Sequence, residues 1–191
     1  MKTAILTLIT PAILTLFACN SSTSESGTSN SDTTLTATGQ DRGGGVESAR
    51  GNLNDEEFVK EAVNGGMAEV ELGELAVEKA EDAKVKEFAN MMITDHTKAN
   101  EELKILADKK EISLPIEPTA EKKMVKKNLS SLSGEEFDKA YIEQMVKDHT
   151  KTISLFEKQM TSVKDPELKT FIENTLPTIK GHLEHCRKLS E

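Results

Sequence analysis

The chain has 191 residues, with 33 acidic against 24 basic side chains and a net charge of −9. This acidic balance argues against binding to nucleic acid and against electrostatic attachment to anionic lipid. Trp is absent and Tyr141 is the only tyrosine, which argues against an aromatic sugar-binding platform. The abundance of Ala, Glu, Lys and Leu favours helices.

The first residues predict export. Lys2 precedes an apolar run, AILTLITPAILTLFA, that is too short to span a bilayer as a mature helix. The run ends in LFAC at 16–19, which resembles the lipobox of bacterial lipoproteins, where the signal is cut before the cysteine and the thiol receives a diacylglycerol. We therefore predict a lipoprotein signal peptide over 1–18 and lipidation of Cys19. The alternative is an ordinary secretory signal with a chance cysteine. Asn20 suits sorting to the outer membrane, facing the periplasm.

Residues 19–53 are rich in Ser, Thr and Gly and contain few apolar side chains. Such a segment cannot bury enough surface to offset the entropy of ordering, so we predict a disordered tether. Cys186 is the only cysteine besides Cys19, so acylation of Cys19 leaves no intrachain disulfide. Residues 54–191 have the size of one domain with one core.

Capping signals divide this domain into helices. Asn54 with Glu57, and Ser133 with Glu136, have the spacing of capping boxes. The predicted long helices cover 55–81, 84–110, 134–162 and 166–189, and the basic stretch 120–132 predicts a small connecting helix between the second and third. Short links make the flanking pairs antiparallel. The expected fold is therefore all-α, an antiparallel up-down four-helix bundle.

Each long helix places one ionisable residue in its apolar stripe. At 100° per residue, Glu69, His96, His149 and His182 all take core positions. Counted from the turns that join each pair, all four lie at depths of about 20–26 Å. The sequence therefore predicts that they meet in one layer of the core.

Two interpretations of this layer stay open, because buried polar groups need partners. Three neutral imidazoles and a carboxylate could bind one transition-metal ion, with zinc, copper, iron or manganese as candidates. Alternatively, Glu69 could pair with a protonated histidine in a hydrogen-bonded layer that holds no metal.

The tetrad DHTK occurs twice, at 95–98 and 148–151. Asp95 and Asp148 each precede a core histidine and could orient an imidazole N–H from outside the ligand set. Pairing with a nearby lysine is the alternative for both. His185 lies three residues after His182, so it is either an extra member of the site or an exposed side chain.

Several blocks, including AEVELGELA, VKEFANMMITDHTKANEEL and LKTFIENTLPTIKGHL, resemble the bacterial envelope family called domain of unknown function 4142. The resemblance covers 55–189 and implies a ferritin-like four-helix bundle in the cell envelope, without an established activity. Ferritin-like di-iron sites use Glu-x-x-His pairs. The residues three before His96, His149 and His182 are Ile93, Val146 and Ile179, so a di-iron site lacks its ligands and one mononuclear site is expected.

These observations support three functions. The first is a lipid-anchored module that binds one transition-metal ion through Glu69, His96, His149 and His182. The second is a non-enzymatic envelope module that binds another protein or a cell-wall component. The third is a hydrolase with Glu69 as base, for which nothing in the sequence selects a substrate. Whether the protein is an enzyme stays open, with a non-enzymatic role preferred.

Overall fold

The computed structural model describes residues 53–191. The predicted signal peptide, the lipidation of Cys19 and all but the last residue of the predicted tether therefore lie outside the described residues. Within 53–191, no helix is long and apolar enough to cross a membrane.

The described chain is helical and contains no strand, so the predicted all-α class is confirmed. The five helices are α1 (Asp55–Lys79), α2 (Ala83–Lys109), α3 (Ala120–Ser130), α4 (Gly134–Met160) and α5 (Pro166–Leu189). The four long helices end within two residues of their predicted bounds, and α3 is the predicted connecting helix.

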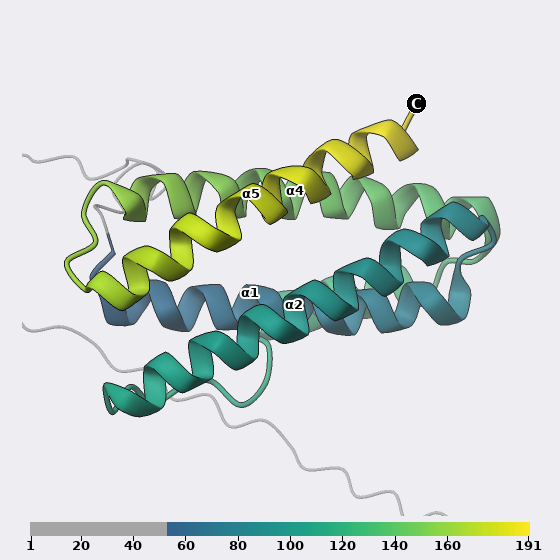
Figure 1. Ribbon diagram of the computed structural model, residues 1–191. Helices are drawn as coiled ribbons and strands as arrows, with labels where there is room; N and C mark the ends of the chain where they lie inside the picture. The colour runs from purple at the N-terminus through teal and green to yellow at the C-terminus, as the bar shows by residue number, and fades with distance from the viewer. Residues whose placement is uncertain (1–52) are drawn as a thin grey trace, which may run out of the picture. The chain divides into compact units, whose positions relative to one another are not determined.

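The long helices pack in two pairs, α1 with α2 and α4 with α5 (Figure 1). Residues 80–82 join the first pair and residues 161–165 join the second, so each helix runs back along its neighbour. The pairs meet through α1 against α4 and α2 against α5, and α3 packs across α1 and α4. The apolar stripes of the long helices therefore share one interior.

The caps explain where the helices begin. The Asn54 side chain accepts a hydrogen bond from Glu57 N at 2.8 Å and Asn54 N donates to the Glu57 carboxylate at 3.2 Å, so this predicted capping box is confirmed. The box predicted at Ser133 is wrong, because the Ser133 side chain makes no capping hydrogen bond. Ser133 has the extended backbone of an N-cap, with φ of −154° and ψ of 162°, and the left-handed φ of 60° belongs to the next residue, Gly134.

The apolar core has two parts, one toward each end of the long helices. One contains Phe88, Met92, Phe137, Tyr141 and Met145, among others. The other contains Phe58, Leu103, Phe156, Phe171 and Ile172, among others. Along the four long helices, Glu69, His96, His149 and His182 fall between the two parts. The core is therefore divided at mid-length by a polar layer.

Candidate metal centre

The structure brings together the four residues that the sequence assigned to one layer. Glu69 comes from α1, His96 from α2, His149 from α4 and His182 from α5. Their exposed fractions are 2%, 7%, 0% and 3%. Side chains this buried have little contact with bulk water, so their polar atoms need partners within the protein or a bound ligand.

The three imidazoles form a compact cluster. Their ring centroids lie 5.7 Å apart for His96 and His149, 5.3 Å for His96 and His182, and 5.4 Å for His149 and His182. One ring nitrogen from each of the three lies within 4.8 Å of the other two. Small side-chain movements would bring three such nitrogens onto a single ion.

Hydrogen bonds determine which nitrogens of His149 and His182 carry lone pairs. His149 Nδ1 donates to the carbonyl oxygen of Met145 at 2.8 Å, so in the neutral ring Nε2 has no proton. His182 Nε2 donates to Oδ2 of Asp95 at 2.8 Å, so Nδ1 has no proton. These two unprotonated atoms, His149 Nε2 and His182 Nδ1, face each other at 3.4 Å.

This separation suits coordination of one ion. Metal–nitrogen bonds of about 2.0–2.1 Å at a tetrahedral angle place two ligand nitrogens about 3.3–3.4 Å apart. Without a cation between them, two lone pairs at this distance repel each other. The pair therefore has the spacing of two ligands rather than of a neutral hydrogen bond.

His96 and Glu69 contribute two further unpaired atoms. His96 Nδ1 lies 3.2 Å from Oε2 of Glu69, which suits donation by Nδ1 and leaves the lone pair on Nε2. His96 Nε2 and Glu69 Oε1 are both buried without a hydrogen-bond partner. Oε1 is 3.8 Å from Nδ1 of His149, too far for a hydrogen bond. Unpaired buried atoms of this kind are rare, because each costs about 1–3 kcal/mol.

Burial keeps the imidazoles in the form that binds metal. It lowers the pKa of His96 to about 4, and it is also the main cause of the lowered pKa values of His149 and His182. All three rings are therefore neutral near pH 7, as a metal ligand must be. Burial raises the pKa of Glu69 to about 7, against the opposing effect of His149.

The two aspartates of the repeated tetrad have different partners. Asp95 accepts the hydrogen bond from His182 across the α2–α5 contact, which is the orienting role considered for it. Asp148 accepts instead from Lys122 Nζ at 2.9 Å and from Gln144 Nε2 at 2.8 Å. Asp148 thus follows the lysine-pairing alternative, although it is buried rather than exposed.

Sequence reasoning missed Lys122. This residue of α3 reaches across to Asp148 beside the buried layer, with 15% of its side chain exposed. Four lysines follow one another closely in α3, and no sequence signal separates this one from Lys123, Lys126 and Lys127. Only the packing of α3 across α1 and α4 selects it.

The structure does not bring His185 into the cluster. Its ring packs edge-on against Phe88 at 5.2 Å, and its side chain is half-buried. Cys186, the next residue, is buried and donates from Sγ to the carbonyl oxygen of His182 at 2.9 Å. The cysteine therefore supports the helix beside the cluster.

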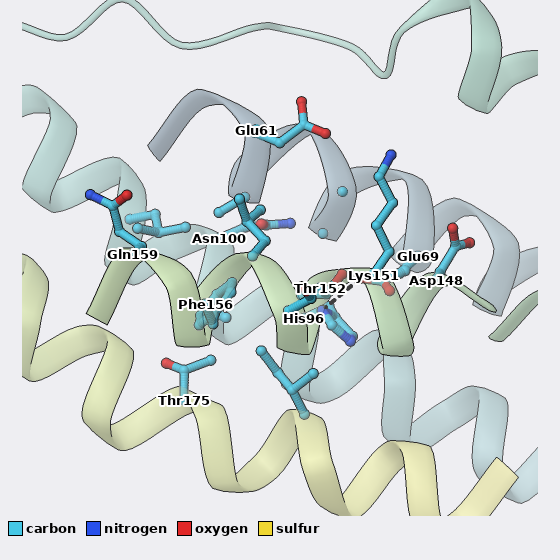
Figure 2. Close-up of a pocket in the computed structure, with 18 of the residues that line it drawn as sticks. Glu61, Glu69, His96, Asn100, Asp148, Lys151, Thr152, Phe156, Gln159 and Thr175 are labelled. Carbon is cyan, nitrogen blue, oxygen red and sulfur yellow. Dashed lines mark ion pairs between the residues drawn. The ribbon is translucent and has the colours of Figure 1, made fainter. Parts of the chain in front are cut away.

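A cavity of about 230 Å³ adjoins the layer (Figure 2). Glu69 and His96 line it at one end, with Asp148 and Lys151 nearby, and Phe156, Gln159 and Thr175 lie toward the other end. Its lining includes the exposed Lys151, so the cavity connects the buried histidine end with the surface.

The fold is similar to that of several solved all-helical proteins. CopM in the Cu(II)-bound form is 17% identical, with a TM-score of 0.64 over 73% of this chain and 97% of that chain. CopM in the Cu(I)-bound form is 16% identical, with a TM-score of 0.62 over 72% and 95%. A DUF305 fragment from Deinococcus radiodurans is 14% identical, with a TM-score of 0.61 over 71% and 93%. At these identities the likeness concerns the fold alone.

A match between the sequence and a family model identifies the family of this chain. Residues 43–189 match the model of the family described as "Domain of unknown function (DUF4142)". The chain therefore belongs to this family, as the quoted blocks indicated. No curated protein matches the sequence.

Proposed function

We propose that His96, His149 and His182 bind one transition-metal ion, and that the protein holds this ion in the bacterial envelope. The observation that carries the proposal is the convergence of three neutral imidazoles in the core, with His149 Nε2 and His182 Nδ1 at 3.4 Å. An ion placed among the rings would pair with both of these lone pairs and with the unpaired Nε2 of His96.

The alternative without metal explains less of the geometry. A hydrogen-bonded polar layer needs a protonated imidazole beside Glu69, whereas burial lowers the pKa values of all three histidines. Such a layer also leaves His96 Nε2 and Glu69 Oε1 without partners. A bound cation would give His96 Nε2 a partner and would also hold Glu69 in its ionised form.

The donor set favours a borderline metal. Neutral imidazoles suit copper, zinc, iron and nickel, and copper(II) has the highest affinity among divalent ions of this series. CopM, which shares the fold, is described in Cu(I)-bound, Cu(II)-bound and silver-bound forms. Copper is therefore the first ion to test, followed by zinc. The role of Glu69 as a fourth ligand stays a prediction, and its contact with His96 Nδ1 also suits a carboxylate that orients the ring.

The cellular setting is part of the same proposal. The run that ends in LFAC supports export and a lipid anchor at Cys19, with the Ser/Thr/Gly-rich stretch as a tether and the outer membrane as the site of anchoring. The paired contacts among the four long helices support a ferritin-like up-down bundle as the domain that carries the metal. A protein or cell-wall partner in the envelope stays a prediction.

Elemental analysis of the full chain tests the proposal. The protein is purified without chelator or metal-affinity resin, incubated with copper(II) or zinc(II), and desalted. We expect about one equivalent of metal in the wild type and little in a His96→Ala/His149→Ala double variant. His185→Ala is the matched control, because His185 is the one histidine outside the cluster, and it should keep the wild-type stoichiometry. Equal metal contents in the double variant and in the wild type would overturn the proposal.

A further inference from the structure

We propose that the cavity beside His96 binds a small carboxylate with an apolar tail, about the size of hexanoate, with its carboxylate at the histidine end. The proposal rests on the metal site above, because a cation among the imidazoles would supply most of the attraction for the carboxylate. It goes beyond metal storage in assigning an organic ligand class to this protein.

Two residues that line the polar end of the cavity have buried atoms without a hydrogen-bond partner. His96 Nε2 and Glu69 Oε1 are buried and unpaired, and both residues line the cavity. Asp148 and Lys122 also line this end and pair with each other at 2.9 Å. A ligand whose polar head reaches this end would lie beside His96, which is the most exposed of the three clustered histidines.

The charges at this end favour an anion once the metal is bound. The acidic side chains that line the cavity are Glu61, Glu69 and Asp148, and the basic ones are Lys122, Lys151 and Lys158. These charges nearly cancel, so a divalent cation among the neutral histidines makes the region positive. A carboxylate is both attracted to such a region and able to complete the coordination of the ion.

The remainder of the cavity is largely apolar. Leu103, Phe156, Phe171 and Ile179 line it and belong to the same apolar part of the core. An apolar cavity of about 150 Å³ accommodates a benzene ring. The volume of about 230 Å³ therefore has room for a six-carbon chain or one ring in addition to a carboxylate. A ligand that is polar throughout would leave these apolar walls hydrated.

Gly65 keeps the cavity open. A glycine inside a helix costs about 1 kcal/mol relative to alanine, so its presence in the middle of α1 needs a reason. At the neighbouring Gly66, a Cβ would lie 2.3 Å from Oδ1 of Asn100, so close packing explains that glycine. At Gly65, a Cβ would meet nothing within 4 Å. Gly65 lines the cavity, so the space that its missing side chain leaves is cavity space.

Calorimetric titration of the full chain with hexanoate tests the proposal. Two comparison ligands are titrated in the same way. Acetate has the same head group without the tail, and hexylamine has the same tail with a head group of opposite charge. The metal content of each sample is measured first. Gly65→Met fills the cavity from α1. Gly181→Met is the matched control, because Gly181 is an exposed helical glycine of α5 that does not line the cavity and whose Cβ would also meet nothing within 4 Å.

We expect metal-loaded wild type to bind hexanoate at least about tenfold more tightly than acetate or hexylamine. Gly65→Met should weaken hexanoate binding by at least about tenfold with unchanged metal content, and Gly181→Met should match the wild type. The smaller substitution Gly65→Ala should give an intermediate affinity for hexanoate. It replaces Gly65→Met in the test if the larger side chain disturbs folding. Equal affinities for hexanoate and acetate, or equal affinities in Gly65→Met and wild type, would overturn the proposal.

Failure of the metal proposal gives a different result. In that case the first measurement finds no bound metal in the wild type, and hexanoate is titrated into the metal-free protein. Binding that Gly65→Met weakens would support the cavity as a carboxylate site that depends on its lysines and not on a metal. Absence of hexanoate binding would overturn it.

Discussion

His149 Nε2 and His182 Nδ1 lie 3.4 Å apart, and hydrogen bonds on the far sides of both rings leave a lone pair on each of these atoms. Met145 and Asp95 thus set the protonation of the two imidazoles from outside the cluster. This arrangement is the one expected of metal-binding histidines, whose second nitrogen usually donates to a carbonyl or a carboxylate.

The two aspartates of the DHTK repeat should respond differently to the same substitution. Asp95→Asn weakens the acceptor of the His182 N–H, so the affinity for metal should fall by about 10–100-fold. Asp148→Asn weakens the ion pair with the partly buried Lys122 and should instead lower the free energy of unfolding by about 2 kcal/mol. Competition with a chromophoric chelator measures the first, and urea denaturation of the metal-free protein measures the second. Equal loss of metal affinity in both variants would contradict the assignment.

Acid should destabilise the metal-free protein through its histidines. The pKa of His96 is about 4 in the folded state and about 6.5 in the unfolded chain, so between these values the unfolded state binds more protons. Stability is therefore lost as the pH falls from about 6.5 to about 4, by about 3 kcal/mol for His96 alone. His149 and His182 shift in the same direction. Thermal melts across this range measure the loss.

Glu69 should oppose this trend. Its pKa is about 7 in the folded state against 4.5 in the unfolded chain, so the folded state binds more protons between these values. The contribution of Glu69 to the free energy of unfolding therefore falls by about 3 kcal/mol as the pH rises through this window. In metal-free protein, Glu69→Gln should therefore gain stability relative to wild type when the pH is raised from about 5 to about 8. Bound metal should abolish the gain, because the cation favours the carboxylate. A difference in melting temperature that is independent of pH would contradict the buried position of Glu69.

The sequence was sufficient for the helices and for the residues of the polar layer. Helix periodicity places Glu69 and His96 in apolar stripes, and equal distances from a short turn bring them to one depth. Periodicity does not indicate which neighbouring helix is contacted by a side chain at the edge of an apolar stripe. The partners of Asp95 and Asp148 depend on how α5 and α3 pack, so the two aspartates had the same alternatives in the sequence and have different partners in the structure.

The same limit applies to α3 and to the glycines. A short basic helix predicts exposed lysines, whereas the position of α3 across α1 and α4 brings Lys122 to Asp148. Gly65, Gly66 and Gly73 are all helical glycines in the sequence, and only the packing against α2 distinguishes open space from close contact. Contacts between helices, rather than local preferences, decide these roles.

Three alanine substitutions on α1 should therefore change the stability in different ways. Gly65→Ala adds a methyl group to open space and improves helix propensity, so the free energy of unfolding should rise by up to about 1 kcal/mol. Gly73→Ala places Cβ 2.8 Å from Cγ1 of Ile93 and 3.1 Å from the carbonyl oxygen of Ala89. This overpacking should lower the free energy of unfolding by about 1–3 kcal/mol.

Gly66→Ala should fall between these two, because the atom that its Cβ approaches is the end of the flexible Asn100 side chain, which can move. Urea denaturation of the three metal-free variants beside the wild type gives the order directly. If Gly65→Ala were as destabilising as Gly73→Ala, the space above Gly65 would be filled by protein. The cavity could then not hold the tail of a ligand.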